Sequence, residues 1–336
     1  MCADRVRLAD VADRAGVSRT TASYVTTGRT DMRISAEAAQ RVHSAARELG
    51  YRPSLLARGL RTQLTHTIGF VSDVIATEPY AGALVRGATA AALEGQTLML
   101  VGESGGDPEV ERRLVQSMLD RGVDGFLYAS MYTKQVQLPA VLRGHRVVLV
   151  NCVGRRRGPS SVVPDEIGGG RSAAQLLLDA GHRDRIVLVG ETPPDVIAGR
   201  QRLAGVTAAL DAAGARLAEQ VDALLWPDSG YVTVRRLLRR RARPSALICL
   251  NDRIALGAYQ AVADAGLAVP HDISVVSFDG SDLAGWLRPE LASVAIPHLQ
   301  LGARGAELLL DRELAATQEQ LPMPVRIGAS VSAPSA

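Results

Sequence analysis

Residues 8–25 read LADVADRAGVSRTTASYV, and their apolar spacing is that of two short helices joined by a tight bend. The apolar positions that would face one another are Val11, Ala15, Val17, Ala22 and Val25. Gly16 can take positive φ at the bend, and Ser18 can accept a hydrogen bond from the first free amides of the second helix. We expect a helix-turn-helix with residues 19–25 as its recognition helix. An ordinary corner between two bundle helices would show the same local spacing.

The chain has 336 residues, of which 47% are hydrophobic, so it can form two or three domains with proper cores. It has no apolar run long enough to cross a bilayer, and residues 1–20 lack a signal-peptide pattern. We therefore expect a cytoplasmic protein with no membrane partner. Cys2, Cys152 and Cys249 have no metal-ligand spacing, so we expect packed thiols, no metal and no cofactor.

Positive charge is concentrated at the N-terminus. Residues 1–66 carry a net charge of +5, whereas the remainder carries −2. This asymmetry is expected if the N-terminal segment meets phosphates. Lys134 is the only lysine, so the abundance of arginine can also reflect genome composition, and we give position more weight than residue type.

A third helix follows the first two. Ser35 is suited to cap its start, Glu37 suits the helix dipole, and Gly50 suits its end. The three helices would make a small DNA-binding headpiece over residues 1–50, followed by a linker over residues 51–65.

Four motifs together resemble a known family. They are Val17-Ser18, Gly50-Tyr51-Arg52-Pro53, Ala57-Arg58-Gly59-Leu60-Arg61-Thr62 and Thr67-Ile68-Gly69. The combination is similar to the LacI/GalR family of bacterial transcription repressors, and the resemblance extends to about residue 331. It implies a regulator that binds double-stranded operator DNA under the control of a small-molecule effector.

The resemblance also assigns the DNA contacts. Arg19, Thr20 and Tyr24 match positions that read base edges in the major groove, and Thr21 and Ser23 match positions that touch the backbone. Ser18 belongs to the same DNA-binding set. Because arginine can bind guanine through two hydrogen bonds, Arg19 is the strongest candidate for direct base recognition. The alternative for Arg19 is a solvated charge that touches only phosphate.

In this family the segment after the headpiece forms a hinge helix on DNA. Ala57 matches a position where the hinge meets the minor groove, and Leu60 matches a leucine that wedges into the central base step. An apolar wedge unstacks the step and lets the duplex bend. The alternative for Leu60 is a linker leucine that packs against the headpiece.

From residue 68 onward, short apolar runs alternate with helical stretches in two series. This alternation predicts two doubly wound parallel-sheet lobes, an α/β architecture. The resemblance implies lobes of periplasmic-binding-protein type over residues 66–333. We expect an N-lobe of about 66–164 with 297–322, and a C-lobe of about 165–296 with 323–333, with crossings near Asp165, Pro297 and Pro322.

Parallel sheets bind ligands beyond the carboxyl ends of their strands. Polar residues that directly follow apolar runs are Asp73, Asn151, Asn251, Asp252 and Asp279. The resemblance assigns effector contacts to Arg202, Asn251 and Asp279, and places Tyr80 and His298 at the cleft. Carboxylates with an arginine would suit a sugar or nucleoside-like ligand.

Several of these residues have a structural alternative. We expect Asp252 to cap the helix that begins at Arg253, and Asp165 to cap or brace its crossover. Tyr80 could lie in the core, His298 could be a satisfied surface histidine, and Trp226 could be ordinary packing. The arginine clusters at residues 155–157 and 235–243 are better explained as solvated faces than as a second nucleic-acid patch.

Two other classes of protein compete with the regulator. A free-standing ligand receptor would require export, for which residues 1–20 carry no signal. A doubly wound enzyme would require catalytic motifs, but the chain has no phosphate loop and no paired motif with catalytic spacing. After Val331 no heptads remain that could form a tetramer, so we expect a homodimer on a pseudo-palindromic operator.

Overall fold

The structure is a computed structural model that describes residues 6–26, 34–51, 64–76, 82–155, 158–311, 313 and 315–335. The chain divides into two units, residues 1–65 and residues 66–336. Within the described ranges, no helix is long and apolar enough to cross a membrane.

The small unit contains three helices, α1 (Leu8–Ala15), α2 (Arg19–Thr26) and α3 (Ala36–Glu48). Its core consists of Val11, Ala12, Ala15, Ala22, Val25, Val42 and Ala45. Gly16 ends α1 with a φ of 64°, and the Ser18 hydroxyl accepts a hydrogen bond from the Thr21 amide at 3.0 Å. Arg41 on α3 donates to the Ala15 carbonyl at 3.1 Å, which fixes α3 against the end of α1. The expected helix-turn-helix is confirmed.

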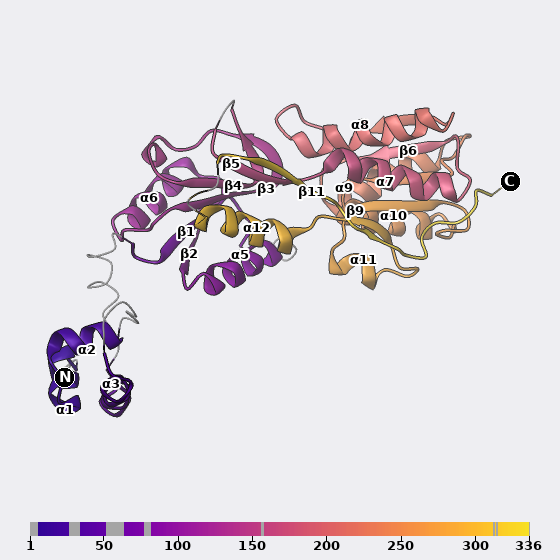
Figure 1. Cartoon of the computed structure of the whole chain (residues 1–336). Coiled ribbons are helices and arrows are strands. Elements are labelled where there is room, and N and C mark those ends of the chain that lie inside the picture. The colour runs from indigo at the N-terminus through magenta and orange to yellow at the C-terminus, as the bar shows by residue number, and fades with distance from the viewer. Residues whose placement is uncertain are drawn as a thin grey trace. The chain divides into compact units, whose positions relative to one another are not determined.

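The large unit contains two six-stranded sheets, with helices on both sides of each (Figure 1). Sheet A has the order β11-β5-β4-β3-β1-β2, and sheet B has the order β12-β10-β9-β8-β6-β7. All strand pairs are parallel except β10 with β12. The α/β class with two doubly wound lobes is therefore confirmed.

The strands of sheet A are β1 (Thr67–Ser72), β2 (Leu98–Glu103), β3 (Phe126–Val136), β4 (Val147–Gly154), β5 (Ser160–Pro164) and β11 (Gln318–Leu321). Those of sheet B are β6 (Ile186–Val189), β7 (Leu217–Val221), β8 (Ala246–Cys249), β9 (Ser274–Asp279), β10 (Ala292–Ala295) and β12 (Val325–Arg326). Alternate side chains fill different layers, because Phe70 and Leu127 pack on one face of sheet A and Val71 and Phe126 on the other.

The helices around sheet A are α5 (Gly82–Glu94), α6 (Pro108–Leu119) and α12 (His298–Leu310), with a short 3₁₀ turn at Ala140–Leu142. Those around sheet B are α7 (Glu166–Asp179), α8 (Ile197–Ala212), α9 (Pro227–Leu238), α10 (Asp252–Asp264) and α11 (Asp282–Trp286). The chain passes between the sheets after β5, β10 and β11, in connections that contain Asp165, Pro297 and Pro322.

Helices α7 and α8 approach closely because glycines lie at their crossing. A Cβ added to Gly170 would meet the Arg202 carbonyl oxygen, and one added to Gly205 would meet the Ile167 carbonyl oxygen. The absence of side chains here lets the first turn of α7 lie against the first turns of α8. This contact brings Glu166 next to Arg202.

Candidate functional site

The exposed face of α2 carries the predicted base-reading residues. Arg19 and Thr20 are exposed and Tyr24 is half-buried, whereas Ala22 and Val25 are buried. Thr21 and Ser23, which are predicted to touch the DNA backbone, are half-buried as well. Ser18 is exposed at the start of α2, where its hydroxyl also lies 2.9 Å from the Thr21 hydroxyl. The helix therefore presents a polar surface of a length that suits a major groove, and the individual contacts remain predictions.

Three of the predicted site residues lie outside the described part of the chain. They are Ala57 and Leu60 of the linker, and Tyr80 ahead of α5.

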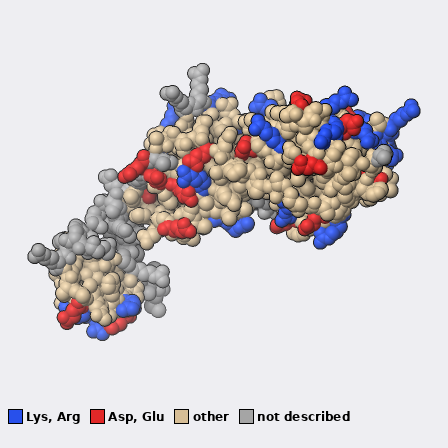
Figure 2. Space-filling view, turned by 45° about the vertical axis from the view of Figure 1, so that its right-hand side comes forward, with Lys and Arg blue, Asp and Glu red and all other residues tan. Residues whose placement is uncertain are grey.

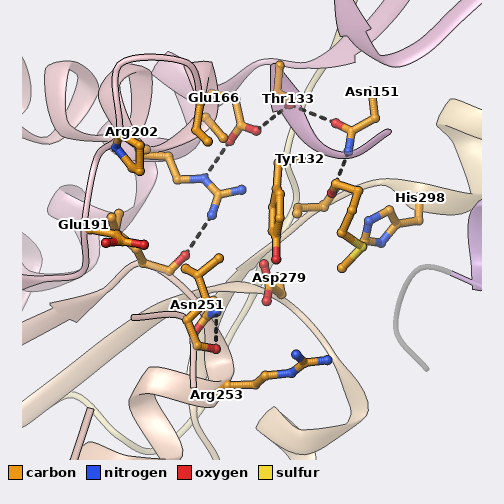
Figure 3. A pocket seen from close by; sticks show the side chains of 18 residues that line it. Tyr132, Thr133, Asn151, Glu166, Glu191, Arg202, Asn251, Arg253, Asp279 and His298 are labelled. Carbon is orange, nitrogen blue, oxygen red and sulfur yellow. Dashed lines mark hydrogen bonds and ion pairs between the residues drawn. The ribbon is translucent and has the colours of Figure 1, made fainter. Parts of the chain in front are cut away.

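A pocket of about 220 Å³ lies between the two sheets of the large unit (Figure 3). Its walls come from strands and helices of both lobes, at the carboxyl ends of β4, β8 and β9. Five of the seven predicted effector residues line it, namely Asn151, Arg202, Asn251, Asp279 and His298. Among the described residues, no group of three His, Cys, Asp or Glu could hold a metal ion.

Arg202 lies in one wall of this pocket and is almost fully buried. Its Nε donates to the Glu166 carboxylate at 2.7 Å, and one Nη donates to the Leu250 carbonyl at 2.8 Å. The guanidinium also lies over the Phe278 ring, 4.6 Å from its centroid. Burial acts to lower the pKa of Arg202, but the charges of Glu166 and Asp279 raise it. The guanidinium is therefore rigid and charged.

Asp279 and His298 face the same pocket without a side-chain hydrogen bond among the described residues (Figure 3). Burial, with the charge of Asp252, raises the pKa of Asp279 to about 8, against the attraction of Arg202. Burial, with repulsion from Arg202, lowers the pKa of His298 to about 4. An acid group and a neutral imidazole thus remain available to hydrogen-bond a ligand.

Asn151 shapes the floor of the pocket. Its amide nitrogen donates to the Ser130 and Met131 carbonyls at 2.9 and 3.0 Å, and its oxygen accepts from the Thr133 hydroxyl at 2.8 Å. A φ of 56° places Asn151 in the left-handed region, which asparagine tolerates better than most residues. These bonds hold the end of β3 over the pocket.

The expectation that Asp252 caps α10 is wrong. Asn251 is the cap, and its side-chain oxygen accepts from the Ile254 amide at 2.7 Å. Asp252 is instead buried and accepts hydrogen bonds from Ser277, Ser281 and Ser293. The asparagine comes first in the chain, so the residue next to it is already helical. Asp165 does cap α7, by accepting from the Gly168 amide at 2.9 Å.

Asp73 is not among the residues that line the pocket. Its carboxylate accepts from the Met131 amide at 2.9 Å and from Ser130 at 2.8 Å, and pairs with Lys134 at 2.9 Å. Burial acts to raise the pKa of Asp73, but the bonds from Lys134, Val74 and Ser130 hold it below its ordinary value. Asp73 therefore braces the segment of β3 that borders the pocket.

The structure also bears on the alternatives given above for His298 and Trp226. His298 is buried rather than a surface histidine. Trp226 is 56% exposed, and the Arg253 guanidinium lies 4.6 Å from its ring centroid.

Within residues 235–243, Arg240 pairs with Glu219 and Arg243 donates to a backbone carbonyl. Positive and negative side chains are interspersed on the face shown in Figure 2. The contacts of Arg240 and Arg243 fit a solvated face at residues 235–243. Two of the three arginines at 155–157 lie outside the described residues.

The sequence reasoning missed Glu166, Thr133 and Tyr132. Glu166 is the second residue after β5, so the rule that selects the polar residue directly after an apolar run selects Asp165 instead. Thr133 and Tyr132 come from the middle of β3, where a register shift against β4 between Ala129 and Lys134 turns them to the pocket. The sequence pattern gives no signal for such a shift.

Comparison with known proteins identifies the family. Residues 7–54 match the family of bacterial regulatory proteins described as the lacI family, and residues 174–331 match a periplasmic binding protein-like domain. The ribose operon repressor of Escherichia coli strain K12 is 34% identical over 316 residues, which cover 93% of this chain and 94% of that protein. The chain belongs to the LacI family of bacterial regulatory proteins.

Solved structures of family members are similar in fold. The lac repressor dimer bound to operator has a TM-score of 0.81 at 24% identity and covers 98% of this chain and 100% of that one. The complex of the transcriptional regulator CelR with cellobiose has a TM-score of 0.69 at 30% identity and covers 97% and 100%. Membership of the LacI family agrees with the expectation of a regulator rather than an enzyme.

Proposed function

We propose that this LacI family protein represses transcription as a cytoplasmic homodimer and that a small polar ligand between its lobes controls its affinity for operator DNA. The arrangement of Arg202, Asp279 and His298 around one pocket carries the ligand-binding part of the proposal. Together they offer hydrogen-bond donors and an acceptor at fixed positions, as a sugar or nucleoside-like molecule with neighbouring hydroxyls requires. The similar proteins include a ribose operon repressor and a regulator in complex with cellobiose, which also favours a sugar.

The lobes supply a means of control. Arg202 and Asp279 belong to elements around sheet B, whereas Asn151 and His298 belong to elements around sheet A. A ligand that contacts both groups binds one lobe arrangement more tightly than another. The ligand can change the affinity for DNA only by the difference between its binding free energies for the two lobe arrangements. Such a coupling is typically about 1–3 kcal/mol.

The ligand part is tested by thermal-shift screening of the full-length protein against neutral sugars and nucleosides. A ligand of this pocket raises the melting temperature of the wild type but not that of Arg202→Met. Asp211→Asn, an exposed change on the same helix α8, is the matched control and retains the shift. A ligand that still stabilises Arg202→Met equally binds elsewhere, and this result would refute the assignment of the pocket.

The DNA part is tested by selecting an operator from random duplexes and titrating it by fluorescence anisotropy with and without the ligand. We expect Arg19→Ala to lose discrimination between operator and random DNA. Leu60→Ala should weaken operator binding far more than non-specific binding, because the wedge acts only on the bent specific complex. Equal loss of both kinds of binding would contradict the wedge.

A further inference from the structure

The charge of Arg202 is already compensated by the protein. The Glu166 carboxylate is only 1% exposed and accepts from Arg202 at 2.7 Å through one oxygen and from the Thr133 hydroxyl at 2.9 Å through the other. The bond to the Leu250 carbonyl occupies a further guanidinium nitrogen. A ligand therefore meets N–H donors of Arg202 but not an uncompensated positive charge.

The other charges around the pocket add to this effect. Among the described residues, the carboxylates Glu166 and Glu191 line the pocket against two guanidinium groups, Arg202 and Arg253, so these four groups leave no net positive charge. Asp279 also lines the pocket, and its pKa of about 8 keeps its carboxyl group largely protonated at neutral pH. The Arg253 guanidinium lies over the Trp226 ring, 4.6 Å from its centroid. Behind Asp279 lies buried Asp252, held by three serine hydroxyls. An anionic group in the pocket would face carboxylates in a medium that screens charge poorly.

We propose that Glu166 sets the charge selectivity of the pocket, so that it accepts neutral polyhydroxy ligands and rejects those that carry a phosphate or carboxylate group. The proposal rests on the proposed function only in taking this pocket as the effector site. Selectivity arises here from repulsion built into the site as well as from attraction. The same arginine without Glu166 would offer a planar fork that matches phosphate and carboxylate.

The first experiment titrates the full-length wild type by calorimetry with matched pairs of compounds, D-ribose with D-ribose 5-phosphate and D-glucose with D-glucose 6-phosphate. Any neutral sugar that binds should do so at least about 30-fold more tightly than its phosphate. The proposal would be overturned if a sugar phosphate bound as tightly as its neutral partner and if this binding were lost in Arg202→Met.

The second experiment frees Arg202 in Glu166→Gln, which keeps the shape of the side chain and one acceptor oxygen but removes its negative charge. We expect the preference for neutral over phosphorylated sugar to shrink at least about tenfold. Inorganic phosphate at about 20 mM and matched ionic strength should raise the melting temperature of Glu166→Gln by several degrees more than that of the wild type. The double variant Glu166→Gln/Arg202→Met should lose this extra stabilisation.

The phosphate experiment separates the two proposals. If no neutral sugar binds the wild type, the proposed ligand class fails, but inorganic phosphate still decides the role of Glu166. An unchanged response to phosphate in a folded Glu166→Gln, checked by circular dichroism, overturns the charge-selectivity proposal. If Glu166→Gln does not fold, the wild type and Arg202→Met are compared instead. The proposal is overturned if phosphate raises the melting temperature of the wild type but not that of Arg202→Met. It is supported if phosphate does not stabilise the wild type.

Discussion

At the scale of single residues, Asp279 and His298 make stability depend on pH in opposite directions. The pKa of Asp279 is raised from its ordinary 3.8 to about 8, so between these values the folded chain holds a proton that the unfolded chain has lost. The free energy of unfolding therefore falls as pH rises. The pKa of His298 is lowered from 6.5 to about 4, so its contribution to the free energy of unfolding rises with pH between these two values. Between pH 6.5 and 8, Asp279 is therefore the only one of these two groups that makes the free energy of unfolding depend on pH.

We therefore predict that the wild type loses stability from pH 6.5 to 8, by at most about 1.4 kcal/mol per pH unit from this group. Asp279→Asn removes the titrating group and flattens this part of the profile. Urea unfolding at each pH measures the slope. Asp211→Asn, an exposed change, is expected to retain the wild-type profile. A slope that persists in Asp279→Asn would assign it to another group.

The sequence indicates that a helix cap is present more readily than it indicates which of two neighbouring residues provides the cap. Reasoning from strand ends located Asn251 and Asp252 together but assigned the helix cap to Asp252, whereas Asn251 caps α10 and Asp252 is buried among serine hydroxyls. The difference depends on a single residue of helix register, which decides whether a side chain turns back to the helix amides or into the core. Glu166 was missed for a related reason, since Asp165 directly follows β5 and caps α7, whereas Glu166 is the next residue and already helical.

At the scale of elements, the approach of α7 and α8 determines the geometry of the pocket. We predict that Gly205→Ala lowers the free energy of unfolding of the large unit by about 1–3 kcal/mol, because its methyl group would meet the Ile167 carbonyl and separate the helices. Separation would also lengthen the bond between Glu166 and Arg202, so ligand affinity should fall. Denaturant unfolding and calorimetry measure the two effects.

Gly82→Ala is the matched control for this change. Gly82 lies at the start of α5, where an added Cβ would have only the Arg86 side chain nearby among the described residues, at 4.0 Å. Alanine there should be neutral or slightly stabilising, as expected for a helical position. If Gly205→Ala behaves like Gly82→Ala, the crossing tolerates a methyl group and does not control the pocket.

Most of the strands that the sequence predicted are buried, and the exception is the edge strand β2, whose apolar run at residues 98–101 is partly exposed. The apolar runs of β1, β3, β4, β6, β8 and β9 were recognisable because strands covered on both faces are almost wholly apolar. β7, β11 and β12 lie at or next to sheet edges, and their residues include polar ones such as those of Gln318–Leu321. Backbone hydrogen bonds hold these strands, and side-chain patterns do not reveal backbone pairing.

At the scale of the whole molecule, the headpiece and the ligand pocket lie in different units of the chain, so control of DNA binding requires an intermediary. The proposed homodimer supplies one, because a pseudo-palindromic operator is bound tightly only when two headpieces bind it together. Resemblance over nearly the full length of the chain predicted this organisation. The spacing within single motifs could predict the headpiece and the ligand pocket, but not that the pocket controls DNA binding by the headpiece.

The edge of sheet A is the surface that we expect to join the two copies. β2 is an edge strand, and Leu98 and Val101 on it and Val110 on α6 are 58%, 44% and 40% exposed. An exposed apolar edge strand is a liability in a monomer and is suited to pairing with a second copy.

We predict that Val101→Lys shifts the protein from dimer to monomer at concentrations of about 1 µM, because it would place an unpaired charge in the interface. Sedimentation velocity measures the change. Operator affinity in anisotropy titrations should fall with it, while ligand binding at the distant pocket persists. Val232→Lys on α9, where valine is 52% exposed, is the matched control and should leave the dimer intact. If Val101→Lys remains dimeric and binds operator normally, the copies meet through another face.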